Sequence, residues 1–187
     1  MVAMPQFTVM PIAGLPLFAP GMVVADEVLK ALDRQGLALE DGDVVVLAQK
    51  IVSKAEGRHL SLDGVAAGDD ARVLAGRTGR PVPLAQAILD ESADILRATP
   101  AAIIARHRTG HVLANAGIDA SNVAGGDAGT VLLWPADPDA SARAIRAAMM
   151  APTGACLGVV IADSMGRAWR IGTVGTAIGV AGLAVVD

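Results

Sequence analysis

The stretch Leu157-Gly-Val-Val-Ile-Ala-Asp163-Ser164-Met-Gly166 decides the fold, because a continuous apolar run leads directly into a carboxylate and a hydroxyl. Uninterrupted apolar runs of this length are typical of strands that are buried in a sheet. We expect a strand over residues 157–162 that presents Asp163 at its end. A turn containing Ser or Gly would then let a phosphate or a cation approach the backbone.

A second aspartate follows another apolar run, in Asn115-Ala-Gly-Ile-Asp119-Ala-Ser-Asn122. The preceding residues, 103–105 and 111–114, predict a hairpin that turns at residues 108–110. Taken alone, either aspartate is more often a turn or cap residue than a ligand. Two carboxylates at two strand ends, however, offer the hard oxygen ligands that divalent cations prefer, and they predict one shared metal site.

The rest of the chain alternates strand and helix patterns. The run Val44-Val-Val-Leu-Ala48 predicts a strand that is covered on both faces. We further expect strands at residues 7–12 and 130–134, helices at 26–35, 84–97 and 140–149, and a buried strand or helix within 171–186. This order predicts a mixed α/β fold in which helices pack on mixed sheets, as one domain over residues 1–187.

Composition limits the functions that the chain can have. Hydrophobic residues make up 53% and charged residues 18%, with two Phe, two Trp and no Tyr, so the core must consist of small aliphatic side chains. The net charge of −4 and the lack of a basic cluster argue against nucleic-acid binding. The single Cys156 cannot form an internal disulfide, and no signal peptide or bilayer-spanning run is evident, which favours a cytoplasmic protein without a membrane segment.

Several blocks in a fixed order carry a resemblance that covers almost the whole chain. The sequence resembles the coenzyme F420-0:L-glutamate ligase family, whose members use GTP to add glutamate to the precursor of coenzyme F420. The blocks are Gly14-Leu-Pro-Leu-Phe-Ala-Pro-Gly21, Gly42-Asp-Val-Val-Val46, Lys50-Ile-Val-Ser-Lys54-Ala-Glu-Gly-Arg58, Ala114-Asn-Ala-Gly-Ile-Asp119-Ala-Ser-Asn-Val123, Asp137-Pro-Asp-Ala-Ser-Ala142 and Asp163-Ser-Met-Gly-Arg-Ala-Trp-Arg170.

The resemblance implies a reaction through an acyl phosphate, with F420-0 and L-glutamate as substrates and a homodimer as the assembly. It implies Mg²⁺ or Mn²⁺ as the divalent cation and allows K⁺ as an additional ion. The metal ligands that it implies are Asp119, Asp163 and Ser164. Catalytic roles fall on Lys54, Asp119 and Asp163. The GTP contacts that it implies are Leu15, Pro16, Leu17, Phe18, Gln49, Lys54 and Asn122.

Elementary chemistry agrees with these roles. Phosphoryl transfer needs positioning and charge neutralisation more than covalent catalysis, and metals with a nearby Lys54 would supply both. The chain has no Gly-x-x-x-x-Gly-Lys-Ser/Thr loop, so a nucleotide site must be assembled from separated segments. Arg167 and Arg170 are candidates for holding an anionic substrate group. By contrast, His107 and His111 show no metal-ligand spacing and are expected at ordinary surface or hairpin positions.

Two departures from the family pattern leave alternatives open. Family members commonly read Trp-Arg-Asn-Gly-Gln followed shortly by Asp, where this chain has Ile171, Thr173 and Gly175, so the acceptor can differ. Family members also continue beyond the position of Asp187, which predicts a C-terminally incomplete domain. The alternatives are a catalytically silent nucleotide-binding or assembly subunit, and an amide ligase for another acid.

Overall fold

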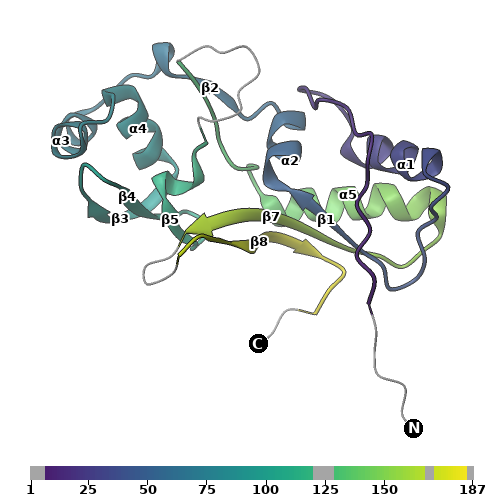
Figure 1. Cartoon of the computed structure of the whole chain (residues 1–187). Coiled ribbons are helices and arrows are strands. Elements are labelled where there is room, and N and C mark those ends of the chain that lie inside the picture. Colours follow the sequence, from purple (N-terminus) through teal and green to yellow (C-terminus); the bar gives the residue numbers. More distant parts are fainter. Residues whose placement is uncertain (1–6, 120–128, 167–170, 185–187) are drawn as a thin grey trace, which may run out of the picture.

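The structure is a computed structural model that describes residues 7–119, 129–166 and 171–184 (Figure 1). Its described residues form five α-helices, eight strands and two short 3-10 helices. In chain order these are α1 (Val24–Arg34), β1 (Val44–Ala48), α2 (Gln49–Ala55), β2 (His59–Ser61), η1 (Leu62–Gly64), α3 (Asp69–Thr78), α4 (Val82–Asp90), β3 (Ser92–Ala98), β4 (Ile103–His107), β5 (Val112–Ala114), η2 (Asn115–Gly117), β6 (Thr130–Leu132), α5 (Pro138–Thr153), β7 (Gly158–Gly166) and β8 (Thr173–Ala181). The predicted α/β class is therefore confirmed.

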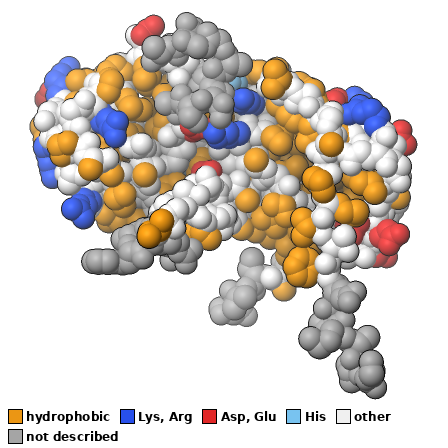
Figure 2. Space-filling model, in the orientation of Figure 1, with side chains coloured by type: hydrophobic (Ala, Val, Ile, Leu, Met, Phe, Trp, Pro, Cys, Tyr) orange, Lys and Arg blue, Asp and Glu red, His pale blue; other side chains and the backbone are white. Residues whose placement is uncertain are grey.

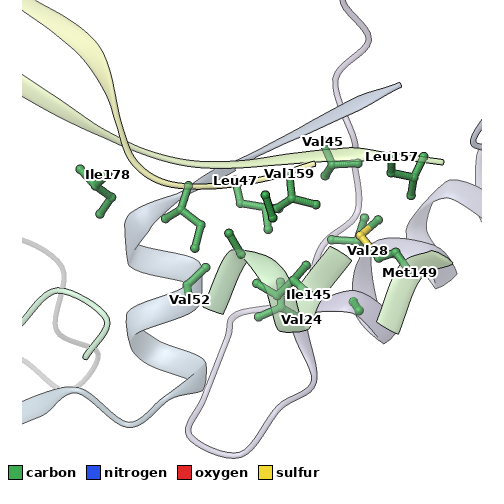
Figure 3. Close-up of a cluster of buried hydrophobic side chains, with 14 of the residues drawn as sticks. Val24, Val28, Val45, Leu47, Val52, Ile145, Met149, Leu157, Val159 and Ile178 are labelled. Carbon is green, nitrogen blue, oxygen red and sulfur yellow. The ribbon is translucent and has the colours of Figure 1, made fainter. Parts of the chain in front are cut away.

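The first sheet has the order β1-β7-β8 and carries the larger core. Strand β1 runs parallel to β7, and β8 runs antiparallel to β7. Helices α1, α2 and α5 lie over one face of this sheet (Figure 1), and their apolar side chains meet those of the strands (Figure 3). Val28, Met149 and Val159 are completely buried in this cluster, which ties the central strand β7 to helices α1 and α5.

The described residues leave the other face of β1 largely uncovered, which corrects one expectation. Val45 and Leu47 are buried, but Val44 and Val46 on the alternate face are 45% and 62% exposed. The apolar run in β1 was expected to be covered on both sides, and periodicity alone cannot show whether a second layer exists. The homodimer that the resemblance implies stays a prediction.

A second cluster of apolar side chains lies in the other half of the molecule. It joins α3 and α4 to the antiparallel sheet β3-β4-β5 and to the pair β2-β6. Ile88 and Ile103 are fully buried there. Figure 1 shows α3, α4 and the β3-β4-β5 sheet grouped on one side, with the β1-β7-β8 sheet and α1 on the other. Leu133 belongs to this second cluster and the adjacent Trp134 to the larger one, so the chain after β6 passes from one cluster to the other.

Two predicted elements differ from the structure. Residues 7–12 form no strand, because the side chain of Gln35 bonds the backbone of Pro11 and Ala13 in place of a neighbouring strand. The helix expected over residues 84–97 ends at Asp90 and gives way to β3, which pairs with β4. The hairpin β4-β5 and a helix over residues 140–149, within α5, are confirmed.

Strand β7 is longer than the apolar run predicts. It continues through Asp163 to Gly166, because β8 pairs with it along the polar half as well. Asp163 therefore lies within a strand rather than after one. In the described residues, no helix is long and apolar enough to cross a membrane.

Candidate functional site

The candidate site lies at the carboxyl end of β1, beside β7. Ala48, the last residue of β1, pairs with Ala162, so Asp163 is the next residue along β7. Helix α2 begins directly at Gln49, which places Lys50 in its first turn at the same edge. The Lys50 Nζ atom lies 2.6 Å from Oδ2 of Asp119. This ion pair brings the first aspartate motif to the strand ends that hold the second.

The backbone of Asp119 is fixed by pairing with β6. Its N–H donates to the carbonyl of Leu132 at 3.0 Å, and its carbonyl accepts from the N–H of Leu132 at 2.8 Å. The preceding turn, η2, has left-handed backbone angles at Asn115 and Ala116, with φ values of 52° and 51°. L-residues rarely adopt this conformation, so the turn that delivers Asp119 is held under local strain.

The carboxylate of Asp163 is oriented by two donors. The indole Nε1–H of Trp134 donates to Oδ2 at 2.9 Å, and the backbone N–H of Ser164 donates to Oδ1 at 2.8 Å. Both oxygens keep unused lone pairs, since a carboxylate offers about four acceptor sites. A half-buried, oriented carboxylate of this kind is suited to binding a cation.

The structure does not place the Ser164 side chain beside that of Asp163. Consecutive residues of a strand face opposite sides of the sheet, so the Ser164 hydroxyl lies on the exposed, outer face. Gly175 pairs with Ser164, and Thr173 pairs with Gly166 on β8. Ile171 is fully exposed at the start of the same hairpin arm. Thr173 and Gly175, two of the positions that depart from the family pattern, thus lie on the strand that pairs with this end of β7.

The segment that contains Leu15, Pro16, Leu17 and Phe18 runs between the ends of two helices. At its start, the carbonyl of Gly14 accepts from Arg34 of α1 at 2.9 Å. At its end, the N–H of Gly21 donates to the carbonyl of Ala55 in α2 at 2.8 Å. Leu15 and Phe18 pack partly against the larger core, whereas Leu17 is 92% exposed. The structure therefore brings the end of this segment next to Lys54.

Lys54 and Gln49 have different surroundings. Lys54 lies one helical turn after Lys50, on the same side of α2. Within the part of the chain that the structure describes, no ion pair involves Lys54. Gln49 is buried, and its Nε2 donates to Ser53 Oγ at 2.6 Å and to the Leu133 carbonyl at 3.4 Å. Its amide is thus committed to internal bonds.

The remaining predicted residues lie outside the described ranges. These are Asn122, Arg167 and Arg170. Figure 2 shows basic and acidic side chains lying side by side in the middle of one face, between the two halves of the molecule. Sequence reasoning missed Lys50 in this site, although its spacing of four residues from Lys54 on a short polar helix was a usable signal.

A buried network behind the site was also missed. Glu91 lies within 3.4 Å of Arg58, His107 and Arg108. His107 ends β4 in the β4-β5 hairpin, as expected, but it has no exposed surface, so a surface position is wrong for it. The N–H of Thr109 donates to its Nδ1, which leaves Nε2 to carry the proton toward Glu91. No local pattern distinguishes this buried histidine from an exposed one.

The network sets the charge state of Glu91. Burial would raise the pKa of Glu91, but the hydrogen bond from His107 and the positive charges of Arg108 and Arg58 outweigh burial, and the pKa lies below its ordinary value. A lowered folded-state pKa stabilises the fold at every pH above the unfolded-state pKa, near ~4.3. That stabilisation disappears as the pH falls through the lower folded-state value.

Glu91→Gln is therefore expected to destabilise the fold at pH 7 and to matter little in acid. Loss of a charged hydrogen-bond acceptor costs about 2 kcal/mol, which corresponds to roughly 4–8 °C in the unfolding midpoint of a chain of this size. Calorimetry at pH 7, and again at a pH below the folded-state pKa of Glu91, measures the unfolding midpoints of the variant and the wild type. The control Glu27→Gln removes only the helix-surface pair with Lys30. A difference from wild type that persists undiminished in acid would contradict the assigned charge state.

The side chains at the candidate site can be matched to the ligands that a divalent cation requires. Within residues 7–119, 129–166 and 171–184, no three His, Cys, Asp or Glu side chains group closely enough to hold a metal ion by themselves. Mg²⁺ commonly takes one or two carboxylates and completes its shell with water and substrate phosphates. The oriented carboxylate of Asp163 and the nearby Asp119 fit that mode of binding. The lysines of α2 add positive charge for a phosphate.

Similarity to known proteins identifies the family of the chain. A profile of the F420-0:Gamma-glutamyl ligase family matches residues 14–187. The chain is 43% identical to the Coenzyme F420:L-glutamate ligase of Methanothermobacter thermautotrophicus and 41% identical to that of Archaeoglobus fulgidus, in each case over 175 residues, or 94% of this chain. The enzyme of Methanopyrus kandleri is 42% identical over 158 residues, or 84% of this chain. The matches cover 68%, 67% and 62% of those three relatives.

Proposed function

The chain belongs to the F420-0:Gamma-glutamyl ligase family, and on this premise we propose that it joins L-glutamate to F420-0 in a GTP- and metal-dependent reaction. The observation that carries the proposal is the convergence of Asp119 and Asp163 at the end of β1, beside the lysines of α2. A site of this kind can bind a nucleotide triphosphate together with a divalent cation.

Each residue has a distinct role in the proposal. Asp119 and Asp163 would hold Mg²⁺ or Mn²⁺, whereas the Ser164 side chain faces the other side of β7 and is left out of this ligand set. The bound cation would neutralise charge on the phosphate oxygens during transfer. Lys54 would bind the phosphates, and the segment of residues 15–18 would contact the nucleoside, since Gly21 ties its end to α2. Gln49 would act indirectly, by fixing the first turn of α2.

The reaction proceeds in two displacements. A carboxylate oxygen of F420-0 attacks the γ-phosphorus of GTP, and the bond to the β–γ bridging oxygen breaks to release GDP. The amine of glutamate, after losing a proton, then attacks the acyl carbon of the mixed anhydride. The carbon–oxygen bond breaks, phosphate leaves, and an amide remains. The chain's contribution is positioning and charge, which suits phosphoryl transfer.

An amide ligase for another acid is the alternative that a specific observation favours. Ile171 and Thr173 replace polar residues of the family pattern, and they lie at the exposed outer end of the β7-β8 hairpin arm. Ile171 cannot form the hydrogen bonds of a polar residue, and Thr173 has a shorter side chain than Gln, so an acceptor site with these residues would bind a different acid. The same assay with other carboxylic acids as acceptors separates the two ligase proposals.

Isotope tracing tests the proposed reaction. The chain is incubated with GTP, Mg²⁺ or Mn²⁺, L-glutamate and F420-0 that carries oxygen-18 in its carboxylate, and the products are analysed by mass spectrometry. We expect a product that is heavier by one glutamyl residue, together with phosphate that carries one oxygen-18 atom. Binding of GTP without any amide product would favour the silent nucleotide-binding subunit. Amide product with unlabelled phosphate would rule out the acyl phosphate.

A further inference from the structure

Trp134 is a buried side chain that contacts both aspartate motifs. Its ring is 1% exposed, and its Nε1–H donates to Asp163 Oδ2 at 2.9 Å. On the other side, the ring lies directly on Gly117, two residues before Asp119. A Cβ atom at Gly117 would come within 2.5 Å of two ring atoms, so the contact leaves no room for a side chain there.

The backbone register explains this double contact. Asp119 pairs with Leu132 in an antiparallel bridge, which places Gly117 opposite Trp134. The indole therefore spans the gap between the strained turn of the first motif and strand β7 of the second. A buried indole N–H needs an acceptor, and the Asp163 carboxylate supplies it. The same bond fixes one oxygen of that carboxylate.

Trp134 is itself held from behind by the buried network. The Nε–H of Arg58 donates to the Trp134 carbonyl at 2.8 Å. The rings of His107 and His111 lie 4.7 Å and 5.5 Å from the Trp134 ring, with the His111 ring edge-on. His107 is anchored in turn by Glu91 and Thr109. A ring enclosed on these sides has little freedom to rotate, so its N–H direction is fixed.

We propose that Trp134 is a positioning residue, which orients the Asp163 carboxylate for a divalent cation and keeps the two aspartate motifs in register. This inference rests on the proposed metal site. The indole N–H takes one lone pair of Oδ2 and the Ser164 N–H takes one of Oδ1, which leaves the remaining lone pairs for a cation. Groups that orient a metal ligand in this way commonly change metal affinity by about 10- to 100-fold when removed.

Trp134→Phe tests the proposal, since it keeps a ring against Gly117 and His107 but deletes the N–H donor. We expect the Mn²⁺ dissociation constant, measured by calorimetry or electron paramagnetic resonance in the presence of GDP, to rise roughly 10-fold or more. Asp163→Asn is the positive control. Thr78→Val is the matched structural control, because it removes a buried hydrogen bond in α3, away from the site. It should leave Mn²⁺ affinity unchanged.

A second measurement uses the unmodified chain. The sequence contains two Trp residues, so two indole N–H resonances are expected in a ¹H–¹⁵N spectrum, and the one that remains in Trp169→Phe belongs to Trp134. We expect Mg²⁺ with GDP to shift this resonance, and Asp163→Asn to move it even without metal. These shifts report on the indole–carboxylate bond and not on stability, so they remain informative if Trp134→Phe folds poorly.

The outcomes separate the inference from the proposed function. Wild-type Mn²⁺ affinity in Trp134→Phe, with affinity lost in Asp163→Asn, would overturn the positioning role and leave the metal site intact. Wild-type affinity in Asp163→Asn would remove the metal site itself. A Trp134 resonance that does not respond to Mg²⁺ in the wild-type chain would also overturn the positioning role.

Discussion

Asp119→Asn and Asp163→Asn are each expected to abolish metal-dependent GTP turnover while leaving the fold intact. Asparagine keeps the volume of the side chain but loses the negative charge that a divalent cation requires. Loss of an electrostatic contact that stabilises phosphoryl transfer commonly costs at least about 100-fold in rate. Release of GDP in the presence of Mg²⁺, F420-0 and glutamate measures the effect, and circular dichroism checks the fold.

Two further variants serve as controls for this prediction. Asp94→Asn alters an exposed aspartate that pairs with Arg106 on the surface, so turnover should not change. Ser164→Ala removes the hydroxyl on the outer face of β7, and its effect should be much smaller than that of Asp163→Asn because the two side chains face opposite ways. Undiminished turnover in Asp163→Asn at low metal concentration would refute its role as a ligand.

Lys54→Met is expected to weaken the binding of GTP and GDP by roughly 10- to 100-fold, because it removes a charged hydrogen-bond donor worth about 1.5–3 kcal/mol. Methionine retains most of the aliphatic stem, so the unfolding temperature should hardly change. Titration calorimetry with both nucleotides measures the change. GTP should lose more affinity than GMP, since the ammonium acts on the phosphates.

Lys30→Met is the matched control for Lys54→Met. Lys30 carries the same charge on an exposed position of α1 and pairs with Glu27 in the adjacent turn. The two variants therefore share the change in net charge but differ in distance from the strand ends. Equal nucleotide affinity in Lys54→Met and wild type would show that Lys54 is a solvated surface residue that does not contact the phosphates.

Much of the sheet could be predicted because its residues signal their environment locally. The run before Asp163 predicted a buried strand, and Val159 and Ile161 are indeed fully buried. The end of that strand could not be predicted, since β7 continues to Gly166 only where β8 pairs with it. Likewise, the exposed face of Val44 and Val46 depends on the absence of a covering layer, which the pattern of β1 does not encode.

The sequence predicted the two aspartates of the candidate site but not the residues that hold them in place. Asp119 and Asp163 stood out because each follows an apolar run, and the structure brings both to the end of β1. Trp134 and Glu91 gave no such signal, because their roles arise from contacts between residues far apart in the chain. The Trp134–Asp163 bond spans 29 residues, and the Arg58–Glu91 pair spans 33. Contacts of this kind depend on tertiary packing.

The ion pair between Lys50 and Asp119 has a consequence for binding. Lys50 Nζ lies 2.6 Å from the same carboxylate that is proposed to hold the cation. A divalent cation and the lysine would therefore compete for Asp119 or share its two oxygens. A phosphate group beside the cation would give Lys50 a second anionic partner. Nucleotide and metal are thus expected to bind more tightly together than separately.

Mn²⁺ binding in a double-mutant cycle tests the central claim most directly, namely that Asp119 and Asp163 hold the same cation. Mn²⁺ affinity is measured with GDP present for wild type, Asp119→Asn, Asp163→Asn and the double variant. If both carboxylates bind one ion, each single change weakens it strongly, and the double variant loses much less than the sum of the two. Fully additive losses, or full affinity in either single variant, would contradict the shared site.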